Sequence, residues 1–477
     1  MKKNIIIYLS IIGVFVFLIW IIVEKGNGIV RYNKTEISQN TGNAIYTDKA
    51  KPVIIDSNKN IFHQLTNNIK YPLSILLLQI IIILFLARIF GSIAKRLGQQ
   101  TVIGEILAGI FLGPSILGWL FPEISAFIFP KDSFISLQFL SQIGLAFFMF
   151  VIGMELDLSK IKNKAHDAIL ISHVSIIFPY FLGVGLSYFI YSELAPENVS
   201  FLSFALFLGI SMSITAFPVL ARILKERGLT QTPIGVLAIT CAAADDATAW
   251  CILAAVIAIV KAGSVASSLF TIGLAILYVI FMLKVVKPWL QGISSKYLNN
   301  DKITKPVVAL SFIVLLLSAY FTEIIGIHAL FGSFIAGVIM PNNIRFKEIL
   351  TNKVEDVSTL LLLPIFFAFT GLRTQIGLLN DAHLWALCGI IILVAVVGKF
   401  GGSFVSAKIV GRSWKDSLSL GALMNTRGLM ELIVLNIGYD LGILNPAVFA
   451  IMILMALCTT FMTGPLLDLI NYSFKRQ

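Results

Sequence analysis

The chain has 477 residues, of which 57% are hydrophobic and only 13% are charged. A soluble protein of this length cannot bury that much apolar surface, so the composition excludes an ordinary soluble enzyme or binding domain. The formal net charge of +11 does not indicate a nucleic-acid partner, because the basic residues are spread over many short connections. The composition predicts an all-α polytopic membrane protein whose surroundings are the lipid bilayer.

Apolar runs of about 20 residues, long enough to cross a bilayer, recur along nearly the whole chain. We expect about fourteen spans, with boundaries uncertain by a few residues. In chain order they are 4–23, 71–93, 101–120, 134–155, 168–191, 201–224, 232–260, 268–286, 305–325, 326–341, 357–374, 384–410, 418–437 and 446–472.

The first span follows Met1-Lys2-Lys3, a beginning that also fits a cleaved signal peptide. No small-residue cleavage site follows directly, so an uncleaved anchor is favoured. The polar stretch after it predicts an external segment, and a second polar stretch predicts a cytoplasmic linker. The expected organisation is an N-terminal membrane anchor (1–23), an external polar segment (24–70), a first half of the membrane region (71–286), the cytoplasmic linker (287–304), a second half (305–472) and a cytoplasmic tail (473–477).

Lys and Arg in the short connections predict the orientation, because cytoplasmic loops carry an excess of basic residues. With the N-terminus inside, the cytoplasmic ends carry Lys95-Arg96, Lys160, Lys162, Lys164, Lys225, Arg227 and Lys475-Arg476. Apart from the first loop, the opposite side receives only Lys131, Lys261 and Arg373, and snorkelling is a sufficient explanation for Arg373. We therefore expect both termini in the cytoplasm and the chain in the cell (inner) membrane.

The two halves contain matching segments. Residues 104–109 (GEILAG) match 332–337 (GSFIAG), and residues 147–158 match 366–376 once a single residue is inserted. Either match alone can arise by chance, but two matches in the same order favour a repeat. In the predicted topology the matched segments cross the membrane in opposite directions. Inverted repeats of this kind are typical of secondary transporters, whose site lies near the midplane.

The clearest chemical signal is a pair of acids, Asp245 and Asp246, in the middle of the span at 232–260. A charge at this depth costs at least a few kcal/mol and needs a partner, water or neutralisation. Adjacent helix positions point about 100° apart, so one carboxylate can meet a cation while the other faces a cavity. Lys399, in the span at 384–410, is the natural partner of one acid, although it can instead snorkel to an interface.

Two other spans have the composition of interrupted helices. In 211–218 (SMSITAFP), hydroxyl groups and Pro218 lie in mid-span, where proline frees a backbone carbonyl; an ordinary kink is the alternative. In 425–431 (NTRGLME), polar and charged residues interrupt an apolar run, and its last residue can pair with Arg427. The residues expected to support the breaks are Pro218, Asn425, Thr426, Arg427 and Glu431.

Together these segments resemble the monovalent cation/proton antiporters of the second cation–proton antiporter group, which are related to the bacterial NapA and Kef transporters and to plant cation/proton exchangers. The resemblance covers about residues 71–472. It rests on residues 104–114 (GEILAGIFLGP), Thr215-Ala-Phe-Pro218, the two aspartates, Lys399 and residues 425–433 (NTRGLMELI).

The resemblance implies an inverted-repeat, NhaA/NapA-like fold with 13 core helices after the extra anchor, two crossed discontinuous helices and a homodimer. It implies that Asp246 binds the ion, that Asp245 pairs with Lys399, and that Thr215 and Ser213 belong to the site. Asp246 and Thr215 would be the ligands of Na⁺ or K⁺. Electrogenic members share the two acids and the lysine, so two protons per Na⁺ is the expected stoichiometry.

The expected activity is secondary active exchange of a monovalent cation for protons, with no enzymatic chemistry and no cofactor. Na⁺ is favoured, and K⁺ and Li⁺ stay open. Alternatives are a channel-like K⁺ efflux transporter of the Kef type and a sodium-coupled solute symporter. Kef-type ligand gating is not expected, because no Gly-rich nucleotide-binding domain follows the last span. An intramembrane aspartyl protease is disfavoured, since its two acids must lie on separate helices.

Overall fold

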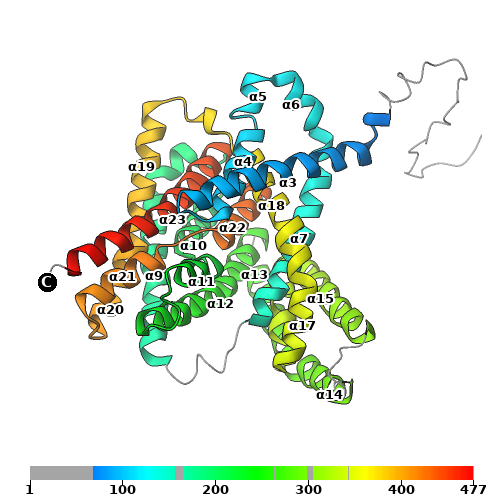
Figure 1. Ribbon diagram of the computed structural model, residues 1–477, viewed down its shortest axis with the longest axis vertical. Coiled ribbons are helices and arrows are strands. Elements are labelled where there is room, and N and C mark those ends of the chain that lie inside the picture. Colours follow the sequence, from blue (N-terminus) through cyan, green and yellow to red (C-terminus); the bar gives the residue numbers. More distant parts are fainter. Residues whose placement is uncertain (1–67, 156–164, 263–264, 298–304, 342, 476–477) are drawn as a thin grey trace, which may run out of the picture. The chain divides into compact units, whose positions relative to one another are not determined.

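A computed structural model describes residues 68–155, 165–262, 265–297, 305–341 and 343–475 (Figure 1). The described residues form helices and connecting turns, with no strand among them. The predicted anchor at 4–23 and nearly all of the segment at 24–70 lie outside the described residues. The longer helices are α3 (Pro72–Arg96), α4 (Thr101–Leu112), α7 (Phe134–Glu155), α9 (Ala165–Leu194), α10 (Phe201–Ser213), α11 (Phe217–Glu226), α12 (Pro233–Ala262), α13 (Val265–Phe281), α14 (Lys287–Tyr297), α15 (Lys305–Ile325), α16 (Ala329–Val338), α17 (Ile344–Val357), α18 (Leu363–Arg373), α19 (Ala382–Val396), α20 (Gly402–Ile409), α21 (Trp414–Met424), α22 (Leu429–Asp440) and α23 (Pro446–Lys475).

Within the described ranges, 10 helical stretches are long and apolar enough to cross a membrane, and the apolar helices α10 and α16 are shorter. The prediction of an all-α, multi-pass membrane protein is confirmed, while the count of 13 core helices stays a prediction. Two predicted boundaries differ from the structure. The span at 268–286 continues through a π-helical turn, η2 (Met282–Val286), into α14, so the first part of the predicted linker is helical. The span at 357–374 begins earlier, since α17 joins α18 through another π-helical turn, η3 (Ser358–Leu362).

The helices form two packing groups. Helices α9, α10, α11, α12, α19, α20, α21, α22 and α23 contact one another, and we call them the bundle. Helices α3, α4, α7, α15, α16, α17 and α18 form the second group, which we call the panel. In Figure 1, α9, α20 and α21 lie on one side and α7, α15 and α17 on the other. Helix α13 packs against both α12 and α15 and so touches both groups.

Glycines at the repeated positions build two equivalent crossings in the panel. A Cβ atom on Gly109 of α4 would collide with the backbone of α18, and one on Gly371 of α18 would collide with the backbone of α4. The same reciprocal relation holds between Gly337 of α16 and Gly153 of α7. Because each pair joins one member of each sequence match, the repeat places its glycines where two backbones touch.

The first glycine of each matched segment, Gly104 and Gly332, also lies against the backbone of a neighbouring helix. A Cβ on Gly104 would collide with the Phe90 carbonyl of α3, and a Cβ on Gly332 would collide with the Ser318 carbonyl of α15. Thus α3, α4 and α7 correspond to α15, α16 and α18, in the same order along the chain. The predicted inverted-repeat fold is confirmed by this correspondence.

The two interrupted spans are both broken, and their breaks meet. Helix α10 ends at Ser213 before α11 begins, and α21 ends at Met424 before α22 begins. The backbone N–H of Ala216 in the first break donates to the carbonyl of Thr426 in the second, at 3.1 Å. Pro218 is the second residue of α11, where a missing N–H leaves no helical bond unmade. The second break contains Gly428 at φ 155°, a conformation open to glycine alone. Two crossed discontinuous helices, as predicted, therefore lie inside the bundle.

Candidate ion-binding site

The crossed breaks lie beside the two aspartates of α12 and the lysine of a π-helical turn, η5 (Val397–Gly401). Asp245 and Lys399 are 0% exposed and Asp246 is 2% exposed. Turns of this kind interrupt α-helices mainly at functional positions, and here the turn carries the buried lysine. Three ionisable groups that are costly to bury are thus concentrated in one part of the bundle.

Lys399 is held by acceptors from three helices. Its Nζ atom lies 2.9 Å from Asp245 Oδ2 and also donates to the carbonyls of Ser213, at 2.5 Å, and Ser175, at 2.9 Å. Ser213 is the last residue of α10, so its carbonyl has no partner within the helix and carries part of the negative end of the helix dipole. All three N–H bonds of the ammonium group are used. The ion pair expected from the sequence is present.

Asp245 is saturated with donors. Besides the ammonium group, it accepts hydrogen bonds from Ser172 Oγ at 2.5 Å, Ser175 Oγ at 2.7 Å and Thr215 Oγ1 at 2.9 Å. The two serines lie three residues apart on α9 and so share a face of that helix. Sequence reasoning did not identify them, because their spacing alone does not distinguish them from hydroxyls that bond their own helix. A carboxylate with four donors has little capacity left for another ion.

Asp246, the next residue, has the opposite environment. Neither of its carboxylate oxygens has a hydrogen-bond partner among the described residues. The backbone N–H of Phe217, at the start of α11, interacts with this carboxylate without meeting hydrogen-bond geometry. An ionised carboxylate buried in this way is strongly destabilised until a proton or a cation neutralises it. Of the two acids, Asp246 is therefore the one with free ligand atoms.

Arg427, in the second break, caps the first broken helix. It donates to the carbonyls of Ser211, at 3.0 Å, and Met212, at 2.7 Å, in the last turn of α10. Glu431 lies one turn further along, 3.3 Å from Arg427. Arg427 and Lys399 thus bring two positive charges to the end of α10 that carries unpaired carbonyls. Cations in this position stabilise a helix end, and here they also stabilise the break.

Some of the other predicted residues make side-chain hydrogen bonds, and one does not. The Thr426 hydroxyl hydrogen-bonds with that of Thr463. The two polar side-chain atoms of Asn425, Oδ1 and Nδ2, are buried without a hydrogen-bond partner among the described residues. The Ser213 hydroxyl donates to its own helix, so only its carbonyl faces Lys399. Thr215 Oγ1 bonds Asp245 and the Met424 carbonyl, so a role for Thr215 as a ligand of a cation at Asp246 stays a prediction. The described residues contain no cluster of three or more His, Cys, Asp or Glu side chains with metal-binding geometry.

Comparison with known proteins agrees with this architecture. The family model for the transmembrane sodium/hydrogen exchanger matches residues 81–470. The chain is 45% identical to the Na(+)/H(+) antiporter NhaS4 of Synechocystis sp. over 395 residues, 83% of this chain and 96% of that protein. It is 40% identical to Cation/H(+) antiporter 19 of Arabidopsis thaliana, covering 84% of this chain but only 50% of that longer protein.

Among solved structures, the sodium proton antiporter MjNhaP1 from Methanocaldococcus jannaschii superposes with a TM-score of 0.64. The superposition covers 84% of this chain and 98% of that one, at 14% sequence identity, and therefore shows a shared fold. The family match, by contrast, spans both halves of the membrane region, including the acids of α12 and the lysine of η5. The chain belongs to the sodium/hydrogen exchanger family.

Proposed function

We propose that this chain is a secondary active antiporter that exchanges a monovalent cation for protons, with Asp246 as the carboxylate at which the two compete. The observation that carries the proposal is the contrast between two adjacent acids: one accepts from four donors, and the other has no hydrogen-bond partner among the described residues. A proton and a cation neutralise the same oxygens and so exclude each other. The relatives named as antiporters and the family match support this activity over the channel-like and symporter alternatives.

The exchange is proposed to run by alternating access. Asp246, Asp245, Lys399 and both breaks all belong to the bundle, so the bundle can carry the whole site as one body against the panel. Burial of an unneutralised carboxylate opposes movement of the empty site, which couples transport of the cation to that of protons. We further propose that the cycle is electrogenic, because the ion pair of Asp245 and Lys399 provides a second protonation event besides that at Asp246.

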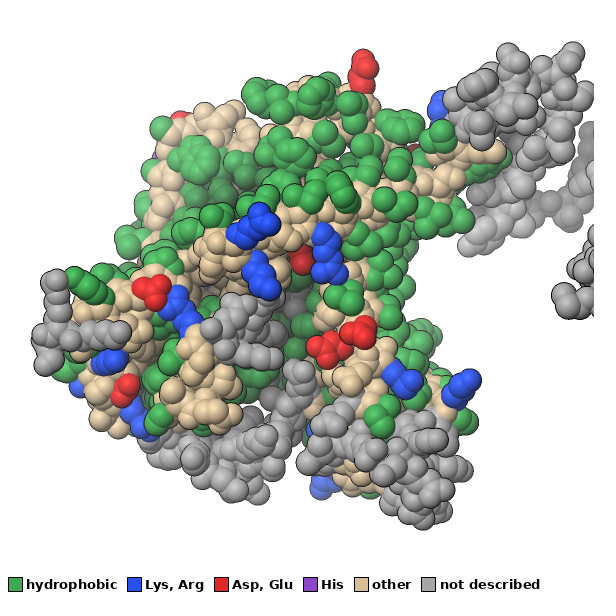
Figure 2. All heavy atoms as spheres, in the orientation of Figure 1, with side chains coloured by type: hydrophobic (Ala, Val, Ile, Leu, Met, Phe, Trp, Pro, Cys, Tyr) green, Lys and Arg blue, Asp and Glu red, His purple; other side chains and the backbone are tan. Residues whose placement is uncertain are grey.

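The membrane arrangement follows as part of the same proposal. The chain would form a homodimer in the cell membrane with both termini in the cytoplasm, and two halves (71–286 and 305–472) would form the transporter. Figure 2 supports the orientation, since hydrophobic side chains dominate the surface over α5 (Leu117–Leu120) and α6 (Pro122–Ile128), and most visible Lys and Arg lie below it. Na⁺ is the favoured cation.

The activity can be tested in proteoliposomes that contain a pH-sensitive dye. We expect Na⁺ added outside to drive proton movement in the parent protein and to have no effect with Asp246→Asn, which cannot exchange a proton for a cation. Asp132→Asn, an exposed acid in the turn before α7, is the matched control and should retain exchange. Separate additions of K⁺ and Li⁺ give the selectivity. Parent-like exchange by Asp246→Asn would refute the assignment.

A further inference from the structure

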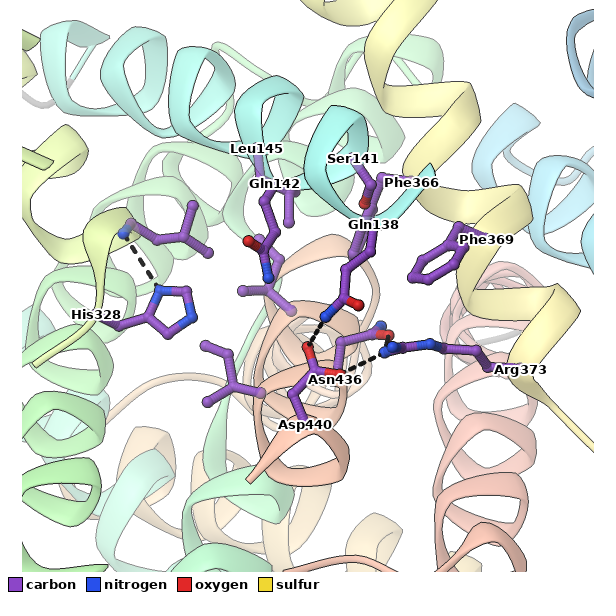
Figure 3. A pocket seen from close by; sticks show the side chains of 13 residues that line it. Gln138, Ser141, Gln142, Leu145, His328, Phe366, Phe369, Arg373, Asn436 and Asp440 are labelled. Carbon is purple, nitrogen blue, oxygen red and sulfur yellow. Dashed lines mark hydrogen bonds and ion pairs between the residues drawn. The ribbon is translucent and has the colours of Figure 1, made fainter. Parts of the chain in front are cut away.

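A small cavity lined by both polar and apolar side chains lies where the bundle meets the panel, away from the ion-binding site. Figure 3 shows side chains of α7, α16, α18 and α22 converging on it, and its volume is about 20 Å³, enough for about one water molecule. It lies at the ends of α18 and α22, which face outward in the proposed orientation. Neither the exchange chemistry nor the crossed breaks uses these side chains.

Asp440, the last residue of α22, is joined to two helices of the panel. Arg373 at the end of α18 donates to its Oδ1 atom at 2.7 Å, and Gln138 of α7 donates to its Oδ2 atom at 3.1 Å. The Arg373 guanidinium also lies 4.4 Å from the ring centre of Phe369 and 5.3 Å from that of Tyr439. An arginine fixed by a carboxylate and two rings is more than a snorkelling side chain, which corrects the sequence-based interpretation of Arg373.

One helical turn deeper, the same two helices are joined again. Asn436 of α22 donates to Thr370 Oγ1 of α18 at 2.8 Å, and its Oδ1 atom accepts from Arg373 at 3.4 Å. The two bonding levels lie along matching faces of α18 and α22, since the residues are three or four positions apart on each helix. Four hydrogen bonds thus cross from panel to bundle within one patch.

Helix α22 connects this patch to the ion-binding site. It begins directly after the break that contains Arg427 and Gly428 and ends at Asp440. Its 12 residues span about 18 Å as one unbroken rod. Movement of the crossed breaks relative to the panel must therefore strain or break the hydrogen bonds at the other end of α22.

We propose that Gln138, Thr370, Arg373, Asn436 and Asp440 form an outer latch, which holds the bundle against the panel on the outer side and must part before the site opens outward. The inference rests on the proposed alternating access. The latch is a conformational lock and binds no transported ion. Weakening it shifts the equilibrium toward outward-open states without removing any ligand of the cation.

Accessibility of a cysteine in the cavity tests the latch. Ser141 lines the cavity and is buried, so Ser141→Cys, in a background with Cys241, Cys251, Cys388 and Cys458 replaced by Ser, reports outer opening. The probe is a membrane-impermeant maleimide added outside to right-side-out vesicles. We expect Asp440→Asn to raise the labelling rate about fivefold or more, the factor that corresponds to the net loss of one ordinary hydrogen bond.

Three further variants keep the test decisive. Asp468→Asn breaks the pair with Arg227, which has the same chemistry but lies wholly within the bundle, and should leave labelling unchanged. Exchanging the charges, Arg373→Asp with Asp440→Arg, should restore slow labelling. If Asp440→Asn misfolds on gel filtration, Gln138→Ala removes a single hydrogen bond and should still raise the rate. Unchanged labelling in a folded latch variant, or equal acceleration by Asp468→Asn, overturns the latch.

This result is separable from the proposed antiport activity, because labelling requires no transport. The latch variants can be measured in the Asp246→Asn background, where we expect the same acceleration. If Asp246→Asn still exchanges ions, the assignment of the transport site fails while the labelling result is unaffected. If labelling fails to respond while Asp246→Asn is inactive, only the latch is wrong.

Discussion

The panel and the bundle are both built from apolar helices, but the panel packs them closely whereas the bundle interrupts two of them around buried charges. In the panel, helices touch backbone to backbone at Gly109 with Gly371 and at Gly153 with Gly337. In the bundle, two spans are broken, and the side chains of Lys399 and Arg427 donate to the carbonyls that the first break leaves unpaired. Close packing of backbones thus joins the panel helices, whereas the bundle interrupts regular helix where it holds buried charges. Substitutions at the buried charges of the bundle should therefore affect both stability and ion exchange, whereas substitutions at the glycine contacts of the panel should affect stability alone.

The largest effect is expected from Lys399→Ala in the bundle. It leaves Asp245 buried without its positive partner and removes a donor to the end of α10, a loss of about 3–5 kcal/mol when one member of a buried pair is deleted. We expect reduced thermal stability in detergent and loss of voltage sensitivity in any exchange that survives. Lys408→Ala is the control, because this lysine on α20 donates to the Arg412 carbonyl and lies over the Trp414 ring, with no carboxylate partner among the described residues. An unchanged voltage response with Lys399→Ala would argue that the pair has no part in charge movement.

A smaller and purely structural effect is expected from Gly337→Ala in the panel. The added methyl group would collide with the backbone of α7, and forcing two packed helices apart costs about 1–3 kcal/mol. Gly389→Ala on α19 is the matched control, because no atom lies within 4 Å of the position of its added Cβ. We expect a lower melting temperature for Gly337→Ala only, with unchanged selectivity among Na⁺, K⁺ and Li⁺ in folded protein. A change of selectivity would show that the panel does more than support the site.

The sequence predicted the parts of each group whose signal is a rare residue in an apolar run. Asp245, Asp246, Lys399 and the polar break around Arg427 stand out because charges seldom occur there. The repeat was predicted from matched segments whose glycines lie where two backbones of the panel touch.

What escaped prediction depends on partners that are distant in the chain. Ser172 and Ser175 look like any hydroxyls that bond their own helix, and only the fold brings them to Asp245, 73 and 70 residues away. Arg373 has an ordinary position for a snorkelling residue until Asp440 is placed opposite it, 67 residues further along. No local pattern in the sequence specifies these pairings.

The smallest effect sharpens the comparison within the bundle, where hydroxyls serve either the site or their own helix. Ser172→Ala removes a donor to the Asp245 carboxylate, a loss of about 1 kcal/mol in the interior of a membrane protein. Ser187→Ala, on the same helix, removes only a bond to the carbonyl of Gly183 and should be nearly neutral. Because Asp245 then loses one of the four donors that hold it in place, we expect Ser172→Ala to slow Na⁺-driven exchange in proteoliposomes, while Ser187→Ala does not. Equal behaviour of the two variants would mean that the hydroxyl at Ser172 only packs, and that Lys399, Ser175 and Thr215 hold Asp245 without it.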